Sequence, residues 1–438
     1  MRHLIVISVD ALVFEDLEFA SSLPNFKYLI ENGSQIKKVR TIYPSLTHPV
    51  HASILTGATA GKTGIINNRL FDINEPDGVS DAWYNNLSDI KCDTLIHAAK
   101  RAGMTVAASS FPLTSCPGDY IDYLLPNALN FYFDESNDAP LDIFKKLGAS
   151  DSMLQIIEEG IKLYGHRDEH PWVDRLQVFC ATEIIKRFKP GLLLTHPSHV
   201  DHMRHGTGVF SNGVKAAIAE TDGWIGMLIN ATKEAGIFEN CDFVVLSDHG
   251  QINITRIAFP NLILKNEGFI KCNSEGKVTE WQAYVNGAGA SAQVYLSDKK
   301  NLALKDAVYS CLLARAKEGL YGFNEVFCEE ELRDKYGLSG DFSFVLEGDG
   351  FTGFRAKVGD EHFSYFDYGN YSKSVGTHGH RPDKGPQPTF IGCGPGFKKG
   401  VIIEEGNILN HAPTLAKLLG VELRDAEGVS VDEILANI

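Results

Sequence analysis

Short, almost wholly apolar runs limit the fold of this chain more than any other feature. Three of them are LIVIS (4–8), LLLT (192–195) and FVVLS (243–247). Such runs are typical of strands that are buried on both faces of a parallel sheet. Three helical patterns alternate with them and each ends in a glycine that suits a helix C-cap, at Gly33, Gly103 and Gly236. This alternation predicts an α/β fold with a doubly wound, mostly parallel sheet.

Residues from about 255 to 370 break the alternation. Strands with alternating residue character, such as SAQVYL (291–296), accompany one helical pattern, LKDAVYSCLLARAKEGL (304–320). We therefore expect a core domain formed by residues 1–254 together with 371–438. The segment 255–370 is expected to form an inserted, smaller α+β subdomain.

The charge balance excludes some classes of partner. The formal net charge of the 438 residues is -15, which argues against a nucleic-acid polymer or an anionic membrane as partner, because both need a basic face. It does not exclude a small anionic substrate, since a bound metal ion can supply positive charge locally. The oligomeric state is not indicated by any pattern.

Neither a membrane span nor a secretory leader is indicated. No stretch approaches the ~20 apolar residues that a spanning helix needs, and the N-terminal run reaches Asp10 too early for a signal peptide. The eight cysteines are scattered without a CxxC pair, so we expect reduced thiols. Together these features favour a cytoplasmic protein without membrane contact.

Acidic residues follow each of the three apolar runs. Asp10 comes after the first, Asp201 lies just beyond the second, and Asp248 follows the third. Ligands of open α/β sheets bind beyond the carboxyl ends of the strands, so these side chains are expected to converge. The alternative for any one of them is that it caps the next helix.

Histidines accompany these aspartates. His205 follows Asp201 by four residues, which places both on one face of a helical turn; His249 follows Asp248 directly, and His378 lies between two glycines. Aspartate and histidine ligands without cysteine suit Zn²⁺ in a catalytic site, and Mn²⁺ is the other candidate. Three aspartates and three histidines suffice for two ions, which about 4 Å apart stabilise an in-line displacement at phosphorus.

Thr47 precedes an apolar helical pattern in the segment YPSLTHPVHASILTG (43–57). A threonine in this position is usually a helix N-cap. A hydroxyl bound to a metal ion can instead ionise and attack, and a helix N-terminus favours an anionic phosphoryl group. Both roles are open at this point, and they do not exclude each other.

The motifs resemble the alkaline phosphatase superfamily, and within it the type I phosphodiesterase/nucleotide pyrophosphatase family. Their order along nearly the whole chain is the family's: Asp10, then YPSLTHPVHASILTG, GIINN (64–68), VDHMRHG (200–206), LSDHG (246–250) and GTHGH (376–380). The resemblance implies an alkaline-phosphatase-like fold and a two-metal hydrolase of phosphodiester or pyrophosphate bonds.

The resemblance also implies the roles of single residues. One metal ion would be held by Asp201, His205 and His378. The second ion would be held by Asp10, Asp248 and His249, with Thr47 bridging as the nucleophile that forms a phospho-threonine. Asn68 would bind a non-bridging phosphoryl oxygen together with the backbone amide of Thr47, an oxyanion-hole role.

The segment after the threonine departs from the family pattern. Members that prefer nucleotides carry an aromatic residue there, followed by Pro-Asn, whereas this chain has His48, Pro49 and Val50. His48 is one candidate for contact with the substrate. Trp83, Tyr84 and Phe111 are further candidates to line the leaving-group side, although aromatic residues are more often part of a core.

Alternative functions remain. A phosphomonoesterase or a phosphonoacetate-type hydrolase of the same superfamily would need additional cationic groups, for which Arg355 and Lys357 are candidates. A non-catalytic metal-binding homologue would leave Thr47 and Asn68 without a role. The segment GATAGKTG (57–64) has three residues, not four, between its first glycine and Gly-Lys, so it is not a P-loop. The Cys-x-Pro-x-Arg pattern of sulfatases is missing.

Overall fold

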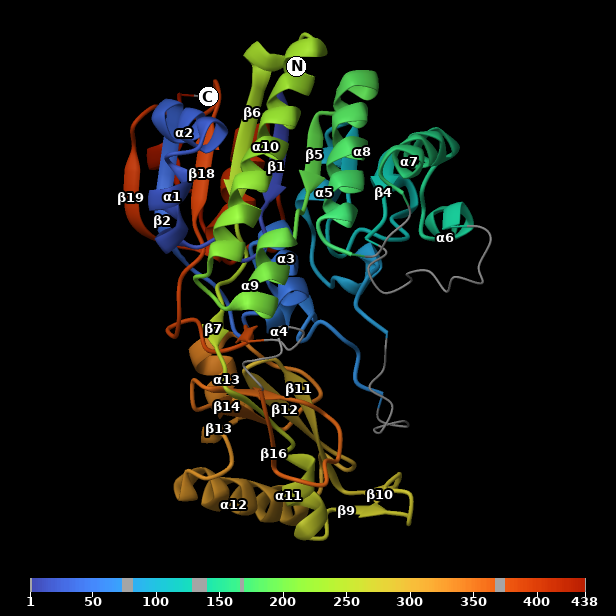
Figure 1. Ribbon diagram of the computed structural model, residues 1–438, viewed down its shortest axis with the longest axis vertical. Coiled ribbons are helices and arrows are strands. Elements are labelled where there is room, and N and C mark those ends of the chain that lie inside the picture. Colours follow the sequence, from blue (N-terminus) through green and yellow to red (C-terminus); the bar gives the residue numbers. More distant parts are fainter. Residues whose placement is uncertain (1, 73–81, 128–139, 166–168, 367–374, 438) are drawn as a thin grey trace.

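One eight-stranded sheet forms the centre of the larger part of the molecule (Figure 1). The computed structural model describes residues 2–72, 82–127, 140–165, 169–366 and 375–437. In spatial order the strands are β19 (Ile402–Asn407), β2 (Gly33–Arg40), β18 (Phe390–Cys393), β6 (Cys241–Leu246), β1 (His3–Ser8), β5 (Leu192–Thr195), β3 (Val106–Ser109) and β4 (Tyr123–Leu125). All neighbours are parallel except β18, which is antiparallel to both β2 and β6. The prediction of a mostly parallel α/β sheet is confirmed.

Helices cover both faces of this sheet, because successive side chains of its strands point in opposite directions. In β1, Leu4 and Val6 join one buried cluster, while Ile5 and Ile7 join the other. The first face is covered by α3 (Thr47–Thr56), α5 (Leu95–Arg101) and α14 (His411–Leu419). The second face is covered by α2 (Pro24–Asn32), α7 (Asp151–Tyr164), α8 (Trp172–Phe188) and α10 (Asn212–Glu234). The shorter helices are α1 (Leu17–Ala20), α4 (Ala60–Thr63), α6 (Pro140–Lys146) and α9 (His199–Thr207).

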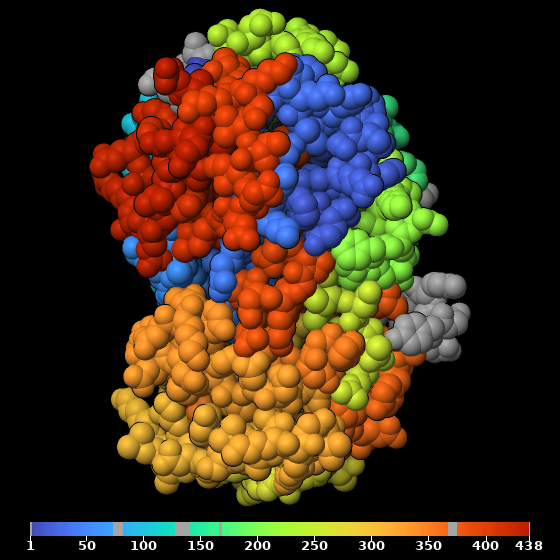
Figure 2. Space-filling model, turned by 90° about the vertical axis from the view of Figure 1, so that its left-hand side faces the viewer, coloured from blue at the N-terminus to red at the C-terminus, as the bar shows by residue number. Residues whose placement is uncertain are grey.

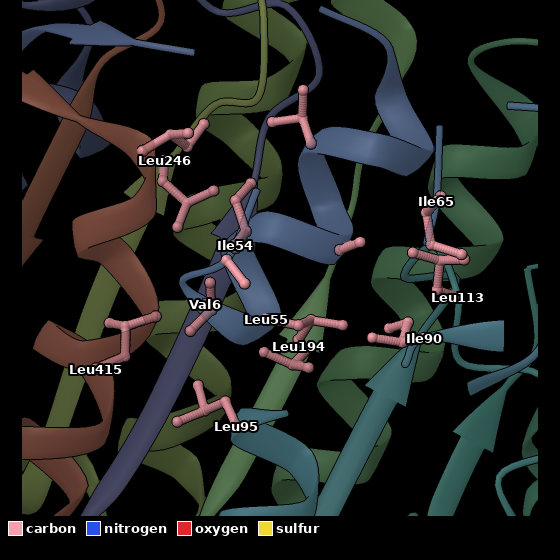
Figure 3. Packing of buried hydrophobic residues seen from close by; sticks show 14 of the residues in the cluster. Val6, Ile54, Leu55, Ile65, Ile90, Leu95, Leu113, Leu194, Leu246 and Leu415 are labelled. Carbon is pink, nitrogen blue, oxygen red and sulfur yellow. The ribbon is translucent and has the colours of Figure 1, made fainter. Parts of the chain in front are cut away.

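Figure 3 shows the packing on the first face, where Ile54 and Leu55 of α3 lie over strand residues such as Val6 and Leu194. All four side chains are at most 1% exposed. Burial of this kind stabilises each side chain by about 1.5–3 kcal/mol relative to an exposed position. It therefore fixes α3, whose first residue is Thr47, against the end of the sheet.

The chain between β6 and β18 builds a second part, seen below the sheet in Figure 1 and as the orange and yellow lobe in Figure 2. Its largest sheet is antiparallel, in the order β11 (Ala283–Ala288), β12 (Ser291–Leu296), β14 (Phe344–Gly348) and β13 (Phe323–Cys328). Smaller sheets are β15 (Thr352–Phe354), β8 (Arg256–Ala258) and β16 (Phe363–Tyr365), and β10 (Val278–Trp281) with β9 (Ile270–Cys272). Its helices are α11 (Asn261–Asn266), α12 (Leu302–Glu318) and α13 (Glu329–Tyr336).

The two passages of the chain between these parts lie side by side. β7 (Ile252–Asn253) leads out of the core and pairs in antiparallel fashion with β17 (Gly376–Thr377), which leads back. The predicted boundary between residues 370 and 371 lies outside the described residues. Within the described ranges, no helix combines the length and the apolar character needed to cross a membrane. All eight cysteines are free.

Candidate active site

The predicted ligand residues lie at one edge of the central sheet. β5, β1 and β6 are adjacent and parallel, so their carboxyl ends meet there. Asp10 follows β1, Asp248 and His249 follow β6, and Asp201 lies in α9 after β5. Residues that are far apart in the chain thus converge at this edge.

Asp201, His205 and His378 form the first group of potential ligand atoms. The Nε2 atom of His205 lies 3.3 Å from Oδ2 of Asp201, one turn away on α9, and Nε2 of His378 lies 3.9 Å from Oδ1 of Asp201. The Nδ1 atoms of both histidines lie within hydrogen-bond distance of backbone carbonyls, Gly376 O at 2.7 Å and Ser45 O at 3.1 Å. A carbonyl can only accept, so Nδ1 carries the proton and the Nε2 lone pair remains for a metal ion.

Asp10, Asp248 and His249 surround the hydroxyl of Thr47. The Nε2 atom of His249 lies 3.5 Å from Asp10 Oδ1, 3.2 Å from Asp248 Oδ2 and 3.2 Å from Thr47 Oγ1. A carboxylate oxygen of Asp201 also lies within 4.8 Å of the potential ligand atoms of Asp10 and His249. The two groups of ligand atoms therefore adjoin each other.

The buried polar atoms of this second group indicate that it fits a cation. Asp10 Oδ1 and Asp248 Oδ2 are buried, have no hydrogen-bond partner among the described residues, and both lie beside His249 Nε2. Two atoms bound to the same ion at 2.0–2.2 Å are separated by about 3–3.5 Å, close to most of the gaps observed here. The aspartate and histidine donors suit Zn²⁺ or Mn²⁺.

The pKa values of the carboxyl groups in the protein without a metal ion show which negative charges a bound cation would stabilise. Burial, followed by the charges of Asp201 and Asp248, raises the pKa of Asp10 well above its usual range. Burial also raises the pKa of Asp248 to about 7. Burial opposes the charge of Asp201 too, but the neighbouring histidines, His205 first, outweigh it and lower the pKa. Three carboxylates buried together are costly unless positive charge is bound between them.

Thr47 is the first residue of α3, not its N-cap. The N-cap is Leu46, and no side-chain hydrogen bond caps this helix. The interpretation of Thr47 as an ordinary cap is therefore wrong, because its hydroxyl lies beside His249 instead. His51, one turn further on, holds the first turn in place: its Nδ1 is 2.7 Å from Thr47 O and its Nε2 is 2.9 Å from Oγ of Ser8, the last residue of β1.

Asn68 lies next to the start of α3. Its Oδ1 accepts a hydrogen bond from the backbone N–H of His48 at 2.9 Å, and its own N–H donates to Asn67 Oδ1 at 2.8 Å. This leaves the Nδ2 group of Asn68 as the donor available to a ligand. Asn68 also lines the cavity beside the histidines of the first group.

A cavity of about 490 Å³ opens between the ligand groups and the inserted part. The core contributes Asn68, Arg69 and the two histidines of the first ligand group, and the insertion contributes residues 286–289 and 354–356. The cavity is large enough for a nucleotide-sized ligand.

The four aromatic candidates are placed differently around this cavity. Trp83 lines it, and the ring of the buried His48 packs edge-on against Trp83 at 5.0 Å. Tyr84 does not line it; its N–H donates to Asn68 O and its ring packs on the core. Phe111 is fully buried beneath the site, with its ring 5.0 Å from that of His51. The structure therefore places Phe111 in the core, where an apolar ring after β3 packs under the sheet edge.

One further residue near the ligand groups was not expected from the sequence. His196 directly follows β5, and its Nε2 lies 3.2 Å from Asp10 Oδ2 while its Nδ1 lies 3.0 Å from Ser8 O. Burial lowers its pKa to about 4, so the imidazole is neutral at pH 7. Its position at a strand end was the available signal. His51, four residues after Thr47, could have been found from the helical spacing.

A third group of potential ligands, formed by His170, Asp174 and His199, lies near α9. Here His170 Nδ1 is only 2.6 Å from Asp174 Oδ2, and the other carboxylate oxygen accepts from Ser198 N at 2.7 Å. A distance of 2.6 Å is a charge-assisted hydrogen bond and leaves no room for an ion between the two atoms. This group instead anchors the N-cap of α9, the helix that carries Asp201.

Comparisons with known proteins found one matching family model and several related sequences. The model of a family described as type I phosphodiesterase/nucleotide pyrophosphatase matches residues 4–379. Ectonucleotide pyrophosphatase/phosphodiesterase family member 3 of Rattus norvegicus is 24% identical over 249 residues, 56% of this chain and 24% of that protein. Venom phosphodiesterase 2 of Crotalus adamanteus is 23% identical over 261 residues, 58% of this chain and 27% of that protein. The chain thus spans about a quarter of the length of these relatives.

Solved structures share the fold over the whole chain. Murine ectonucleotide pyrophosphatase/phosphodiesterase 5, in an inactive threonine-to-alanine form in complex with AMP, aligns with a TM-score of 0.70 at 18% identity and covers 100% of both chains. The human protein of the same name aligns with a TM-score of 0.68 at 18% identity, covering 99% of this chain and 100% of that one. The expected alkaline-phosphatase-like architecture is confirmed.

Proposed function

The chain belongs to the type I phosphodiesterase/nucleotide pyrophosphatase family, and on that premise we propose that it is a two-metal hydrolase of phosphodiester or pyrophosphate bonds. The observation that carries the proposal is the position of the Thr47 hydroxyl, 3.2 Å from Nε2 of His249 within the second ligand group. Asp201, His205 and His378 would hold one ion, and Asp10, Asp248, His249 and Thr47 the other. Two divalent ions, Zn²⁺ or Mn²⁺, would lower the pKa of the hydroxyl and stabilise the negative oxygens at phosphorus.

The protein's own residues prepare Thr47 for attack. The hydroxyl loses its proton to solvent, Oγ1 forms a bond to phosphorus, and the bond between phosphorus and the leaving oxygen breaks. Water then attacks the phospho-threonine, the bond between phosphorus and Oγ1 breaks, and Thr47 regains its proton. The N–H groups at the start of α3 favour the anionic group, and the contacts of His51 with Thr47 and Ser8 keep the hydroxyl in place.

Asn68 acts on the phosphoryl oxygens in this proposal. The hydrogen bond from His48 N holds its Oδ1, which fixes the amide and presents Nδ2 as a donor to a non-bridging oxygen. Removing one such donor typically costs about 10²- to 10³-fold in kcat. Asn68→Ala is therefore expected to reduce turnover by about that factor.

A nucleotide is the substrate group that fits best. One structural neighbour holds AMP, the cavity volume of about 490 Å³ accommodates a ligand of that size, and Trp83 offers an aromatic surface at its wall. A phosphomonoesterase or phosphonate hydrolase is the second candidate, favoured by the arginines that line the same cavity.

The test is turnover of the purified protein on p-nitrophenyl esters with Zn²⁺, with Mn²⁺ and with a chelator. We expect hydrolysis of p-nitrophenyl thymidine 5′-phosphate, loss of activity with chelator and recovery on adding metal. Thr47→Ala is expected to abolish turnover, with both ions still bound or with one ion bound less tightly. Thr47→Ser is expected to keep part of the turnover. Unchanged turnover in Thr47→Ala would refute the nucleophile, and faster hydrolysis of p-nitrophenyl phosphate would favour the monoesterase.

A further inference from the structure

The insertion supplies one buried amide to the segment that carries Asn68. Gln293 lies in β12 and is only 1% exposed. Its Nε2 group donates a hydrogen bond to the backbone oxygen of Ile66 at 2.7 Å, and its Oε1 atom accepts one from Nδ2 of Asn67 at 3.1 Å. A strand of the insertion is thus bonded to both of the residues that precede Asn68.

Asn67 connects Gln293 to the backbone of Asn68. The Nδ2 group of Asn67 also donates to Gly287 O in β11 at 3.3 Å, and its Oδ1 accepts from the N–H of Asn68 at 2.8 Å. These partners fix the orientation of both side-chain amides, because a backbone carbonyl can only accept and a backbone N–H can only donate. The backbone of Asn68 is therefore held from the insertion, while its side chain is held by the N–H of His48 in α3.

The strand that carries this amide is itself fixed against the loop of His378. The N–H of Ala290 donates to His378 O at 2.7 Å, and Oγ of Ser291 donates to Gly379 O at 2.7 Å. Gly289, between β11 and β12, lies so close to this loop that a Cβ atom there would clash with His378 O. The position of β12 relative to the core is therefore set independently of the bonds to Asn67.

We propose that Gln293 is a positioning residue for phosphoryl transfer: through Asn67 it holds Asn68 where the Nδ2 group reaches a non-bridging phosphoryl oxygen. The proposal rests on the proposed function and gives the insertion a part in that reaction. A donor of this kind acts only when it is placed in advance, and a displacement of about 1 Å can cost about 10²-fold in rate. Ile66, Asn67 and Gln293 are at most 7% exposed, so solvent has little access to replace their hydrogen bonds.

The first experiment is a double-mutant cycle of Gln293→Met and Asn68→Ala, measured as kcat and KM of the zinc-loaded protein for p-nitrophenyl thymidine 5′-phosphate. Methionine is an unbranched side chain of similar length that forms neither of the two hydrogen bonds. We expect Gln293→Met to lower kcat by about 10- to 100-fold and to change KM by less than about threefold. In the Asn68→Ala background it should change kcat by less than about threefold, because the donor that it misplaces is already missing.

Two further variants separate positioning from packing. Tyr295→Phe removes a hydroxyl that donates to the same Oε1 atom at 3.1 Å but lies outside the path to Asn68, so kcat should stay close to that of the wild type. Asn67→Ala breaks the path from the core side and should reproduce the loss seen in Gln293→Met. Equal losses from Gln293→Met in both backgrounds, an equal loss in Tyr295→Phe, or wild-type kcat in Asn68→Ala or Asn67→Ala would overturn the proposal.

Hydrogen exchange tests the same contacts without turnover. The N–H of Asn68 is bonded to Asn67 Oδ1, so its exchange rate reports whether Asn67 is held in place. We expect exchange at this amide to be about tenfold faster or more in Gln293→Met and unchanged in Tyr295→Phe.

Failure of the proposed function gives a different result. If the wild-type protein hydrolyses no ester, the hydrolase assignment fails, and the exchange rate alone decides whether Gln293 holds Asn68. Equal exchange in the wild type and in Gln293→Met overturns the proposal whether or not the protein is active. Matching zinc content and thermal unfolding in each variant show that the fold is retained.

Discussion

Two clusters of aspartate and histidine among the described residues each include residues of α9, and the distances leave room for a metal ion in only one of them. In the active-site cluster, the ligand atoms of Asp201, His205 and His249 and their partners are 3.2–3.9 Å apart. In the other cluster, His170 and Asp174 are 2.6 Å apart. The same two residue types therefore form an open site in one place and a closed hydrogen-bonded pair in the other.

Charge balance explains the difference. The active-site cluster buries three carboxylates, and its histidines do not compensate them all, as the raised pKa values of Asp10 and Asp248 show. At the other cluster, burial opposes the charge of His170, but Asp174 outweighs burial and raises the pKa of the imidazole. One proton thus balances one carboxylate there, and no ion is needed.

The largest expected effect comes from the same substitution made in both clusters. Asp201→Asn should reduce bound zinc from two ions per chain to one or fewer, because its carboxylate reaches both ligand groups, and should reduce turnover by about 10³-fold or more. Asp174→Asn should keep two ions. Metal content after dialysis against buffered Zn²⁺, measured by atomic emission, separates the two.

Loss of an ion in Asp174→Asn, or retention of both ions in Asp201→Asn, would contradict this difference between the clusters. The first result would make the His170 cluster a third metal site, and the second would remove Asp201 from the ligand set.

A smaller effect is expected on stability. Asp174→Asn removes the charge-assisted bond to His170 and weakens the anchor to Ser198 N, which should lower the free energy of unfolding by about 1–3 kcal/mol. Urea denaturation measures the loss. The loss should be equal with zinc and with chelator, and a loss seen only with zinc would contradict a closed pair.

The smallest effect is a dependence of that loss on pH. The folded protein holds the pKa of His170 above its ordinary value of 6.5, so the stability that this group contributes is complete below about pH 6.5 and declines as the pH rises through the raised pKa. The advantage of the wild-type protein over Asp174→Asn should therefore be larger at pH 6 than at pH 9. An advantage that grows with pH would show that His170 is neutral in the fold.

The sheet and the convergence of these aspartates and histidines are predictable from the sequence because local patterns encode them. LIVIS, LLLT and FVVLS are apolar on both faces, and the residues after such strands converge at one sheet edge. The i, i+4 spacing of Asp201 and His205 placed both on one turn of α9. His196 also follows the end of a strand. It is one of several histidines in the segment 196–205, and the sequence alone does not distinguish it from the others.

The surroundings of the site were not predictable in this way. The cavity brings together Arg69, Trp83 and Arg355, which no local pattern connects, because it forms only where the insertion packs on the core. The environment of Phe111 also depends on packing between distant segments. The sequence makes it a candidate for substrate contact, whereas its ring lies in the core, 5.0 Å from the ring of His51. A helix cap at Thr47 is one of the two roles that its position before a helical pattern leaves open. The contact of its hydroxyl with His249 depends on the segment after β6, which is distant in the sequence.

The proposed mechanism depends most on a covalent bond between Thr47 and phosphorus. The direct measurement is acid quench of the zinc-loaded protein during turnover of p-nitrophenyl thymidine 5′-phosphate, followed by mass spectrometry of the peptide that contains residue 47. We expect a nucleotidyl group on Thr47 that is missing in Thr47→Ala. Full turnover with an unmodified Thr47 peptide, and with release of product at the same rate from Thr47→Ala, would contradict it.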